Sequence, residues 1–203
     1  LFISKLYDNH YRVRPWTLEL LEEVDYERAF QFYQERFDNA GDFTFYFVGS
    51  FDLETVRPLV EKYLGGLPST FKRENWKDRS ADYFRGMHSD TLRMGLEPKS
   101  STYLIYTGPF EYNIRNRLNF DAMEKMLNIR LNEIVREKIG GVYSIEAYGW
   151  KDKYPNQSYV FNIYFNSDPN QQEKIIEVIE QEIENLQENG FGQSYLDKVN
   201  KQM

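Results

Sequence analysis

Arg136 and Tyr143 are the two residues of this sequence whose types and spacing best suit chemistry on a peptide. They stand seven positions apart, on either side of Gly140-Gly141, where a predicted helix ends and a predicted strand begins. The two glycines lack side chains and so let another backbone approach closely. A guanidinium and a phenol at such a place can donate hydrogen bonds to a peptide carbonyl or to its developing oxyanion. We therefore take this pair as the candidate site.

A purely structural role for the same pair is the alternative. The helix dipole favours a cation in the last turn by about 0.3–1 kcal/mol. Glu133 lies three residues before Arg136 and is a ready ion-pair partner on the helix surface. Tyr143 is one of 16 tyrosines. The residues alone leave both interpretations open.

The sequence gives little support to a zinc site, a catalytic triad or a dinucleotide site. Zinc hydrolases carry two His one helical turn apart with a Glu as general base, whereas His10 and His88 stand far apart in the sequence. No GxSxG motif is present, and isolated His residues give a catalytic triad little support. Gly190-Phe191-Gly192 lacks the third glycine and preceding strand of a dinucleotide site. We predict no metal-binding and no cofactor-binding residues in this chain.

Composition narrows the class of protein. The 203 residues are 41% hydrophobic and 17% aromatic, which is typical of a globular domain with a large core. The net charge of -7 disfavours nucleic acid and anionic membrane surfaces as partners. No stretch reaches the roughly 20 apolar residues that span a bilayer. The absence of cysteine excludes disulfides and thiolate chemistry without fixing a compartment. Because the chain starts at Leu1 without a signal-like segment, we expect a piece of a longer protein.

The sequence of the first half of the chain predicts a helical segment, then a strand, then another helix. Thr17 and Asp25 are suited to cap helices over 18–23 and from Asp25 to Phe37. Residues 42–48 (DFTFYFV) are apolar on both faces, as in a central strand. Asp52 is suited to cap the next helix, which reaches Leu64 and contains Pro58.

The second half predicts strands and helices in a regular order. Asp168 is suited to cap a helix, with Gln171 placed to complete a capping box. A stripe of apolar residues predicts the longest helix, and a period of two predicts the last strand. The predicted elements are strands at 90–95 and 101–107, a helix at 114–138, strands at 142–150 and 158–166, a helix from Asp168 to Gly190, and a helix from Ser194.

This order predicts an α+β fold, a helix-covered sheet sandwich with mixed or antiparallel pairing. Residues 69–86 are polar and charged, and we interpret them as a linker between sub-blocks at about 1–68 and 87–203. We expect the two sub-blocks to form one domain over residues 1–203.

Three stretches resemble a known family. They are LPST after YLGG, the segment FTFYFVGSFDLETVRPLVEKYL, and RLNEIVREKIGGVYS followed by a strand. Together they resemble the C-terminal-type domain of the M16 (pitrilysin and insulysin) metallopeptidases, and within that family the PqqL-type bacterial zinc proteases. The resemblance runs from about Trp16 to the end of the chain and implies the LuxS/MPP-like fold.

The resemblance also implies a function. Family members enclose a peptide between two homologous halves, and the N-terminal half binds zinc through an inverted HxxEH motif and a distal Glu. The other half supplies an Arg and a Tyr, which Arg136 and Tyr143 match in order and spacing. This chain would then be a half without zinc that orients peptides inside a zinc metalloendopeptidase and is inactive alone. A periplasmic or cell-envelope location is consistent with the resemblance, and the sequence itself does not fix it.

Two other functions fit the sequence. M16-like folds also serve as non-catalytic scaffolds or partner subunits, in which the helix-glycine-strand motif is only architecture. A plain peptide-binding module would instead use an exposed sheet edge.

Overall fold

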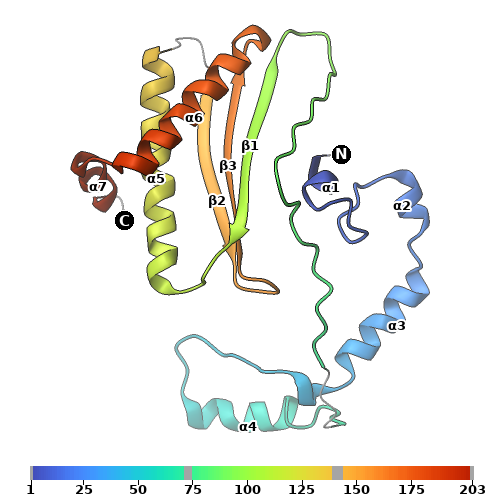
Figure 1. The fold of residues 1–203 in the computed structure, drawn as a ribbon. Coiled ribbons are helices and arrows are strands. Elements are labelled where there is room, and N and C mark those ends of the chain that lie inside the picture. Colours follow the sequence, from blue (N-terminus) through green and yellow to red (C-terminus); the bar gives the residue numbers. More distant parts are fainter. Residues whose placement is uncertain (1, 71–74, 139–143, 202–203) are drawn as a thin grey trace. The chain divides into compact units, whose positions relative to one another are not determined.

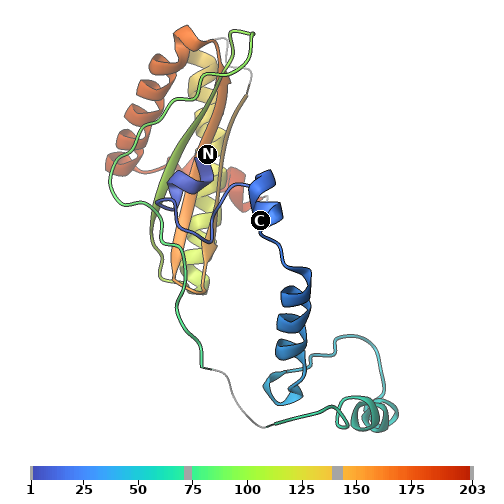
Figure 2. The same cartoon turned by 90° about the vertical axis from the view of Figure 1, so that its right-hand side faces the viewer.

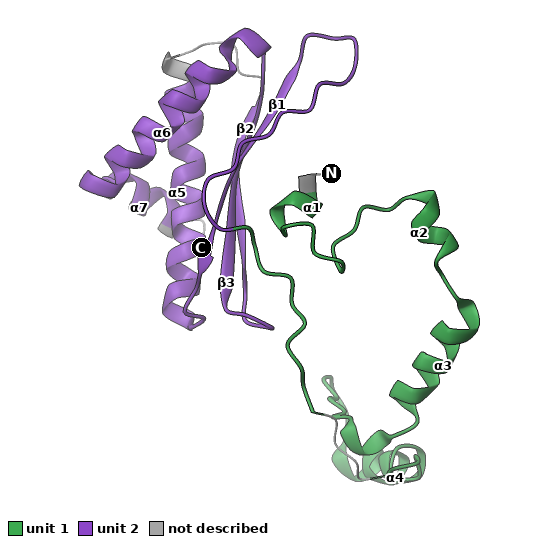
Figure 3. Cartoon of the chain, turned by 45° about the vertical axis from the view of Figure 1, so that its right-hand side comes forward, with its two compact units in different colours: residues 1–84 green, residues 85–203 purple. Residues whose placement is uncertain are grey.

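The computed structural model describes residues 2–70, 75–138 and 144–201. The chain divides into two compact units, Leu1–Phe84 and Arg85–Met203 (Figure 3). Each unit is described by itself. That the two sub-blocks form one domain stays a prediction.

Unit 1 is helical. Its helices begin at the predicted caps: Thr17 Oγ1 accepts from Leu20 N at 3.2 Å, and Asp25 Oδ1 accepts from Arg28 N at 2.8 Å. These side chains satisfy amides that the first helical turn leaves free. The elements of unit 1 are α1 (Phe2–Leu6), α2 (Leu18–Glu22), α3 (Tyr26–Phe37), the 3₁₀ helix η1 (Ala40–Asp42) and α4 (Leu53–Tyr63).

The predicted strand at 42–48 is wrong for this chain. Asp42 ends η1, and residues 43–48 lie in no helix and no sheet within the described ranges. The side chains of Phe45 and Val48 are 47% and 99% exposed. A strand is held by hydrogen bonds to a neighbouring strand, and the described part of unit 1 contains no strand to provide them. The apolar composition was therefore not sufficient to form one.

Unit 2 is a three-stranded antiparallel sheet covered by helices (Figure 1). The strand order is β1-β3-β2, so the last strand in sequence lies in the centre. Ile163 of β3 stands between Leu104 of β1 and Ala147 of β2. The elements of unit 2 are β1 (Ser100–Pro109), α5 (Ile114–Lys138), β2 (Ser144–Asp152), β3 (Ser158–Ser167), the 3₁₀ helix η2 (Pro169–Gln171), α6 (Gln172–Asn189) and α7 (Gln193–Asn200). The predicted α+β fold with antiparallel pairing is confirmed.

Two local predictions for unit 2 are wrong. Residues 90–95 form no strand. Asp168 caps η2 by accepting from Asn170 N at 2.8 Å, but the buried Oε1 of Gln171 has no hydrogen-bond partner, so the capping box does not form. The 3₁₀ turn comes between the cap and α6, and this displaces Gln171 from the position that a capping box requires.

The core lies between the sheet and the helices α5 and α6. Alternate residues of β3 face it, as the period of two requires, and Ile163 and Phe165 are fully buried. Figures 1 and 2 show the long helix α5 running beside the sheet. The remaining large buried side chains of this core are Phe120, Leu127, Leu131, Ile134, Val135, Ile145, Phe161, Ile175 and Ile179.

Substituting Gly149 with Ala is expected to destabilise unit 2 by about 1–3 kcal/mol, as overpacking of a core does. A Cβ on Gly149 would lie 2.6 Å from the carbonyl oxygen of Val160 and 2.7 Å from the ring of Phe120. The carbonyl oxygen of Val160 belongs to the backbone of β3, which cannot move away from the added Cβ as the end of a flexible side chain could. Gly192→Ala is the matched control, because nothing lies within 4 Å of its added Cβ. Urea unfolding of both variants measures the effect, and equal stabilities would contradict the prediction.

Candidate functional site: the end of α5 and the start of β2

The two predicted site residues fall at the edge of what the structure describes. Arg136 belongs to the last turn of α5, but its side chain lies outside the described residues. Tyr143 and the glycine pair also lie outside them, immediately before β2. The predicted helix over 114–138 and the strand that follows it are confirmed.

Side chains of α5 hold β2 in a fixed alignment. Because β2 is an edge strand, some of its backbone groups need partners outside the sheet. Half-buried polar residues of α5 supply them through a set of contacts that we call the α5–β2 contact series. From the end of α5 backward, Asn132 Nδ2 donates to Ile145 O at 3.1 Å, Ala147 N donates to Asn128 Oδ1 at 3.3 Å, and Gly149 N donates to Glu124 Oε2 at 3.0 Å. The series ends in a contact between two side chains, in which Lys151 Nζ donates to Asp121.

The spacing of the contact series is regular. Each step advances two residues along β2 and retreats four, four and then three residues along α5. Two strand residues span about 6.8 Å, and four helical residues span about 6 Å. The helix and the strand therefore run side by side in opposite directions without losing alignment over the length of β2.

A second polar network connects α5 to α6 and α7. Arg130 Nε donates to the buried carboxylate of Glu182 at 2.7 Å, and Arg130 Nη1 donates to Tyr195 Oη at 3.3 Å. The hydroxyl of Tyr195 donates to Glu133, and Lys198 Nζ donates to the other oxygen of Glu133 at 3.2 Å. The carboxylate of Glu182 raises the pKa of Arg130. Glu133 thus has partners on α7. The predicted ion pair of Glu133 with Arg136 lies outside the described residues.

The contacts of Glu133 with α7 are expected to make the stability of unit 2 dependent on pH. The Tyr195 hydroxyl, and after it Lys198, lowers the pKa of Glu133 from its ordinary value of 4.5. A lowered folded-state pKa stabilises the fold above the ordinary value, and the contribution is lost as pH falls through the lowered pKa. We expect wild type to be more stable than Glu133→Gln at pH 7 and to lose that advantage below about pH 4.5. Urea unfolding at several pH values measures it; an advantage that persists at low pH contradicts it.

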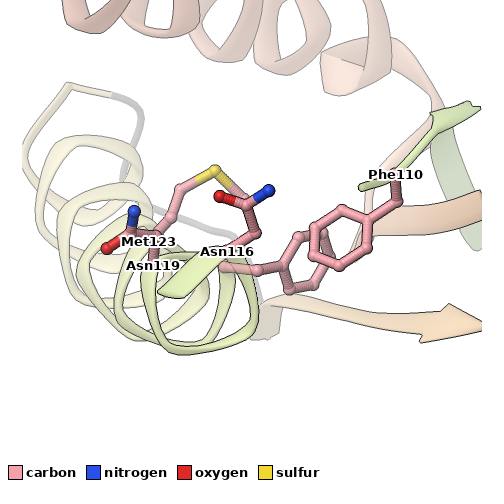
Figure 4. Close-up of a pocket in the computed structure, with 5 residues that line it drawn as sticks. Phe110, Asn116, Asn119 and Met123 are labelled. Carbon is pink, nitrogen blue, oxygen red and sulfur yellow. The ribbon is translucent and has the colours of Figure 1, made fainter. Parts of the chain in front are cut away.

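An open apolar pocket of about 350 Å³ lies near the other end of α5 (Figure 4). Phe110, which follows β1, and Phe120 provide its aromatic wall. Asn116, Asn119 and Met123 come from the first turns of α5. Asn116 and Arg136 are separated by about 30 Å along the helix axis, at 1.5 Å per residue. The pocket is therefore separate from the candidate site.

The described residues do not form a metal site. Within residues 2–70, 75–138 and 144–201, no three His, Cys, Asp or Glu side chains cluster so as to hold a metal ion. His10 accepts from the amide of Arg12 and lies against Tyr11, and His88 is exposed. The donor set that zinc requires does not fit this part of the chain. Among the same residues, no helix has the length and apolar character to cross a membrane.

The helix-covered antiparallel sheet places unit 2 in the α+β class, and sequence comparison identifies the family. Residues 23–203 match the family described as the peptidase M16 inactive domain. The chain belongs to this family.

Relatives by sequence are named as zinc proteases. The chain is 25% identical over 170 residues to a probable zinc protease PqqL of Haemophilus influenzae, covering 82% of this chain and 18% of that protein. It is 23% identical over 211 residues to a zinc protease PQQL-like of Arabidopsis thaliana, covering 95% of this chain and 22% of that protein. The chain thus spans about a fifth of the length of these relatives.

Solved structures share the fold at low sequence identity. A mutant of the ferredoxin protease FusC in complex with Arabidopsis ferredoxin aligns with a TM-score of 0.80 and 15% identity, over 99% of this chain and 22% of that one. The periplasmic protease PqqL from Escherichia coli aligns with a TM-score of 0.67 and 16% identity, over 76% of this chain and 17% of that one. A predicted insulinase family protease from Yersinia pestis aligns with a TM-score of 0.54 and 15% identity, over 94% of this chain and 40% of that one.

The residues that align helix α5 with strand β2 were not among the predicted site residues. Glu124, Asn128 and Asn132 recur every four residues, and this spacing places them along one side of α5. That signal was available in the sequence. What the sequence did not indicate is that the acceptors and donors facing them are backbone groups of β2.

Proposed function

We propose that this chain is the zinc-free half of an M16-type zinc metalloendopeptidase and that it helps to enclose and orient peptide substrates. Arg136 and Tyr143 would be the substrate-contacting residues. A chain that supplies only these two groups is not expected to hydrolyse peptides alone. The family match and the names of the relatives support the proposal.

The observation that carries the assignment of the pair is the alignment of α5 with β2. The contact of Asn132 with Ile145 is the described member of the series that is nearest to the glycine pair. One further step, four residues along the helix and two along the strand, leads to positions 136 and 143, and the side chains of both lie outside the described residues.

The two donors would have different tasks. The guanidinium of Arg136 presents a planar fork of N–H groups that suits carbonyl and carboxylate oxygens of a peptide backbone. The phenol of Tyr143 presents one O–H that can bind the oxyanion formed when the scissile carbonyl is attacked. Donors fixed before the reaction stabilise developing charge without a reorganisation cost. Arg136 would orient the substrate, and Tyr143 would stabilise the intermediate.

The partner of this chain would be a zinc-bearing N-terminal half, on the same polypeptide or as a separate subunit. The names of the relatives support zinc in the whole enzyme. We infer a periplasmic or cell-envelope location from the likeness to the periplasmic protease PqqL. Neither ferredoxin nor any other particular substrate is assigned to this chain.

Arg136→Lys in the longer protein that includes the zinc-bearing half tests the proposal. Lysine keeps the charge but loses the planar fork of N–H donors, so kcat/KM for a fluorogenic peptide is expected to fall about tenfold. This corresponds to about 1.4 kcal/mol of lost transition-state stabilisation. Arg115→Lys is the matched control, because Arg115 is an exposed arginine at the start of the same helix and should tolerate the change. Bound zinc, measured by atomic absorption, should be the same in all variants.

The outcomes separate the candidate functions. A loss of kcat/KM in Arg136→Lys alone supports the enzyme half. Unchanged peptide turnover in both variants would reject the site and leave the scaffold role. Peptide affinity of the 203-residue chain by itself, unaffected by Arg136→Lys, would instead indicate the binding module that uses a sheet edge.

A further inference from the structure

We propose that residues 43–48 are a β-strand that completes a sheet supplied by the longer protein outside this chain. They lie between η1 and α4, in no helix and no sheet within the described ranges (Figure 1). In a strand, alternate side chains point to opposite faces. Neither face of this segment would carry a charge, as in a strand that is covered on both sides. One face would carry Phe43, Phe45 and Phe47, and the other Thr44, Tyr46 and Val48.

Unit 1 has no core of its own among its described residues. None of residues 3–70 and 75–84 is buried, whereas unit 2 has a core. Helices as short as α3 and α4, with 12 and 11 residues, are marginally stable by themselves and gain most of their stability by packing an apolar face. The sequence thus specifies capped amphipathic helices whose apolar faces still need a partner.

A continuous row of exposed rings connects α3 to residues 43–48. The ring centroids of Tyr33 and Phe37 are 4.6 Å apart, those of Phe37 and Phe43 are 5.5 Å apart, and those of Phe43 and Phe45 are 6.2 Å apart. We call these four residues the aromatic row, and they are between 38% and 58% exposed. Soluble proteins rarely expose contiguous apolar surface unless it binds another surface. The aromatic row is therefore an interaction surface.

The partner that fits this surface is a β-sheet with an apolar face and an edge strand. The edge strand would supply hydrogen bonds to the backbone of residues 43–48, and the apolar face would cover the aromatic row. The described part of unit 1 contains no strand. This chain spans about a fifth of the length of its relatives, so most of a protein of that length lies outside it and can supply the sheet. The inference needs the longer protein, as the proposed function does, but not Arg136 or Tyr143.

Hydrogen–deuterium exchange of residues 43–48 in two proteins tests the inference. In the dilute 203-residue chain, these amides should exchange close to the unstructured rate. In the longer protein that includes the zinc-bearing half, they should exchange at least about a thousandfold slower, because they then open only with the sheet. Residues 160–165 of β3 should be protected in both proteins and serve as the internal reference.

Three results would overturn the inference. The first is fast exchange of residues 43–48 in the longer protein, and the second is their full protection in the dilute 203-residue chain. The third is protection that appears only when the 203-residue chain is concentrated, which would assign the surface to a second copy. None of these readouts uses peptide turnover, so a failure here is distinguishable from a failure of the proposed function.

Tyr46→Pro distinguishes strand pairing from burial alone. Proline removes a backbone donor and is not tolerated in the middle of a paired strand. In the longer protein, the remaining amides of residues 43–48 should exchange at least about tenfold faster than in wild type, and in the 203-residue chain they should not change. Trp76→Pro is the control, because Trp76 is 72% exposed and lies in no helix or strand. Unchanged protection in Tyr46→Pro would overturn the assignment of a strand.

Discussion

Replacing Tyr143 with Phe in the longer protein that includes the zinc-bearing half is expected to lower kcat for a peptide about 100-fold or more. The substitution removes one oxygen and keeps the ring, so packing changes little. The loss is that of one oxyanion donor, which in enzymes of this kind typically costs about 10²–10³-fold. If the phenol acts only after the carbonyl is attacked, KM should stay close to the wild-type value.

The matched control for this prediction is Tyr154→Phe. Tyr154 is 76% exposed and lies in the connection between β2 and β3. It should keep full turnover and the same urea midpoint as wild type. Wild-type kcat in Tyr143→Phe, with an unchanged fold, would remove the chemical basis for the protease assignment and leave only the fold and the family.

Amide exchange in the 203-residue chain is expected to differ by orders of magnitude between the two units. Amides of β3 should exchange at least about a thousandfold slower than unstructured amides, because they open only with the core. Residues 43–48 should exchange close to the unstructured rate. They lie in no described sheet, and Tyr46 and Val48 are 86% and 99% exposed. Helices α2, α3 and α4 contain no buried residue and should exchange at rates between these limits.

Hydrogen–deuterium exchange with mass spectrometry can compare residues 43–48 with residues 160–165 in one experiment. The two segments are similar in length and both are rich in apolar and aromatic side chains. A difference in protection between the two segments therefore cannot come from their composition. It can come from the pairing of β3 with its neighbouring strands, which residues 43–48 lack in the described chain. Equal protection of the two segments would show that residues 43–48 are held by structure that the described chain does not include.

Local features were predictable because they depend on neighbours in sequence. The caps Thr17, Asp25 and Asp52 each accept from an amide three residues later, as their residue types indicated. The long helix over 114–138 followed from its apolar stripe. The strand over 158–166 followed from its period of two, and the predicted face with Phe161, Ile163 and Phe165 is buried. Val160 and Asn162 on the opposite face are buried too. For the helix and the strand, the period of apolar residues in the sequence equals the period at which side chains face one side of the element.

Features that depend on distant partners were not predictable. Residues 42–48 have the composition of a central strand, yet no strand pairs with them in the described chain. The placement of β3 between β1 and β2 follows from pairing across the sheet, which no local pattern encodes. The hydrogen bond that Asn132 donates to β2 likewise depends on a carbonyl thirteen residues away.

The sequence by itself determined the α+β class, the positions of most helices and strands in unit 2, and Arg136 and Tyr143 as the candidate pair. It did so because caps, apolar stripes and alternation act over a few residues. Only the tertiary structure decided the order of the strands and the alignment of α5 with β2. The physical reason is that edge backbone groups must find partners, and in β2 several of those partners are side chains of a helix that precedes it in the chain.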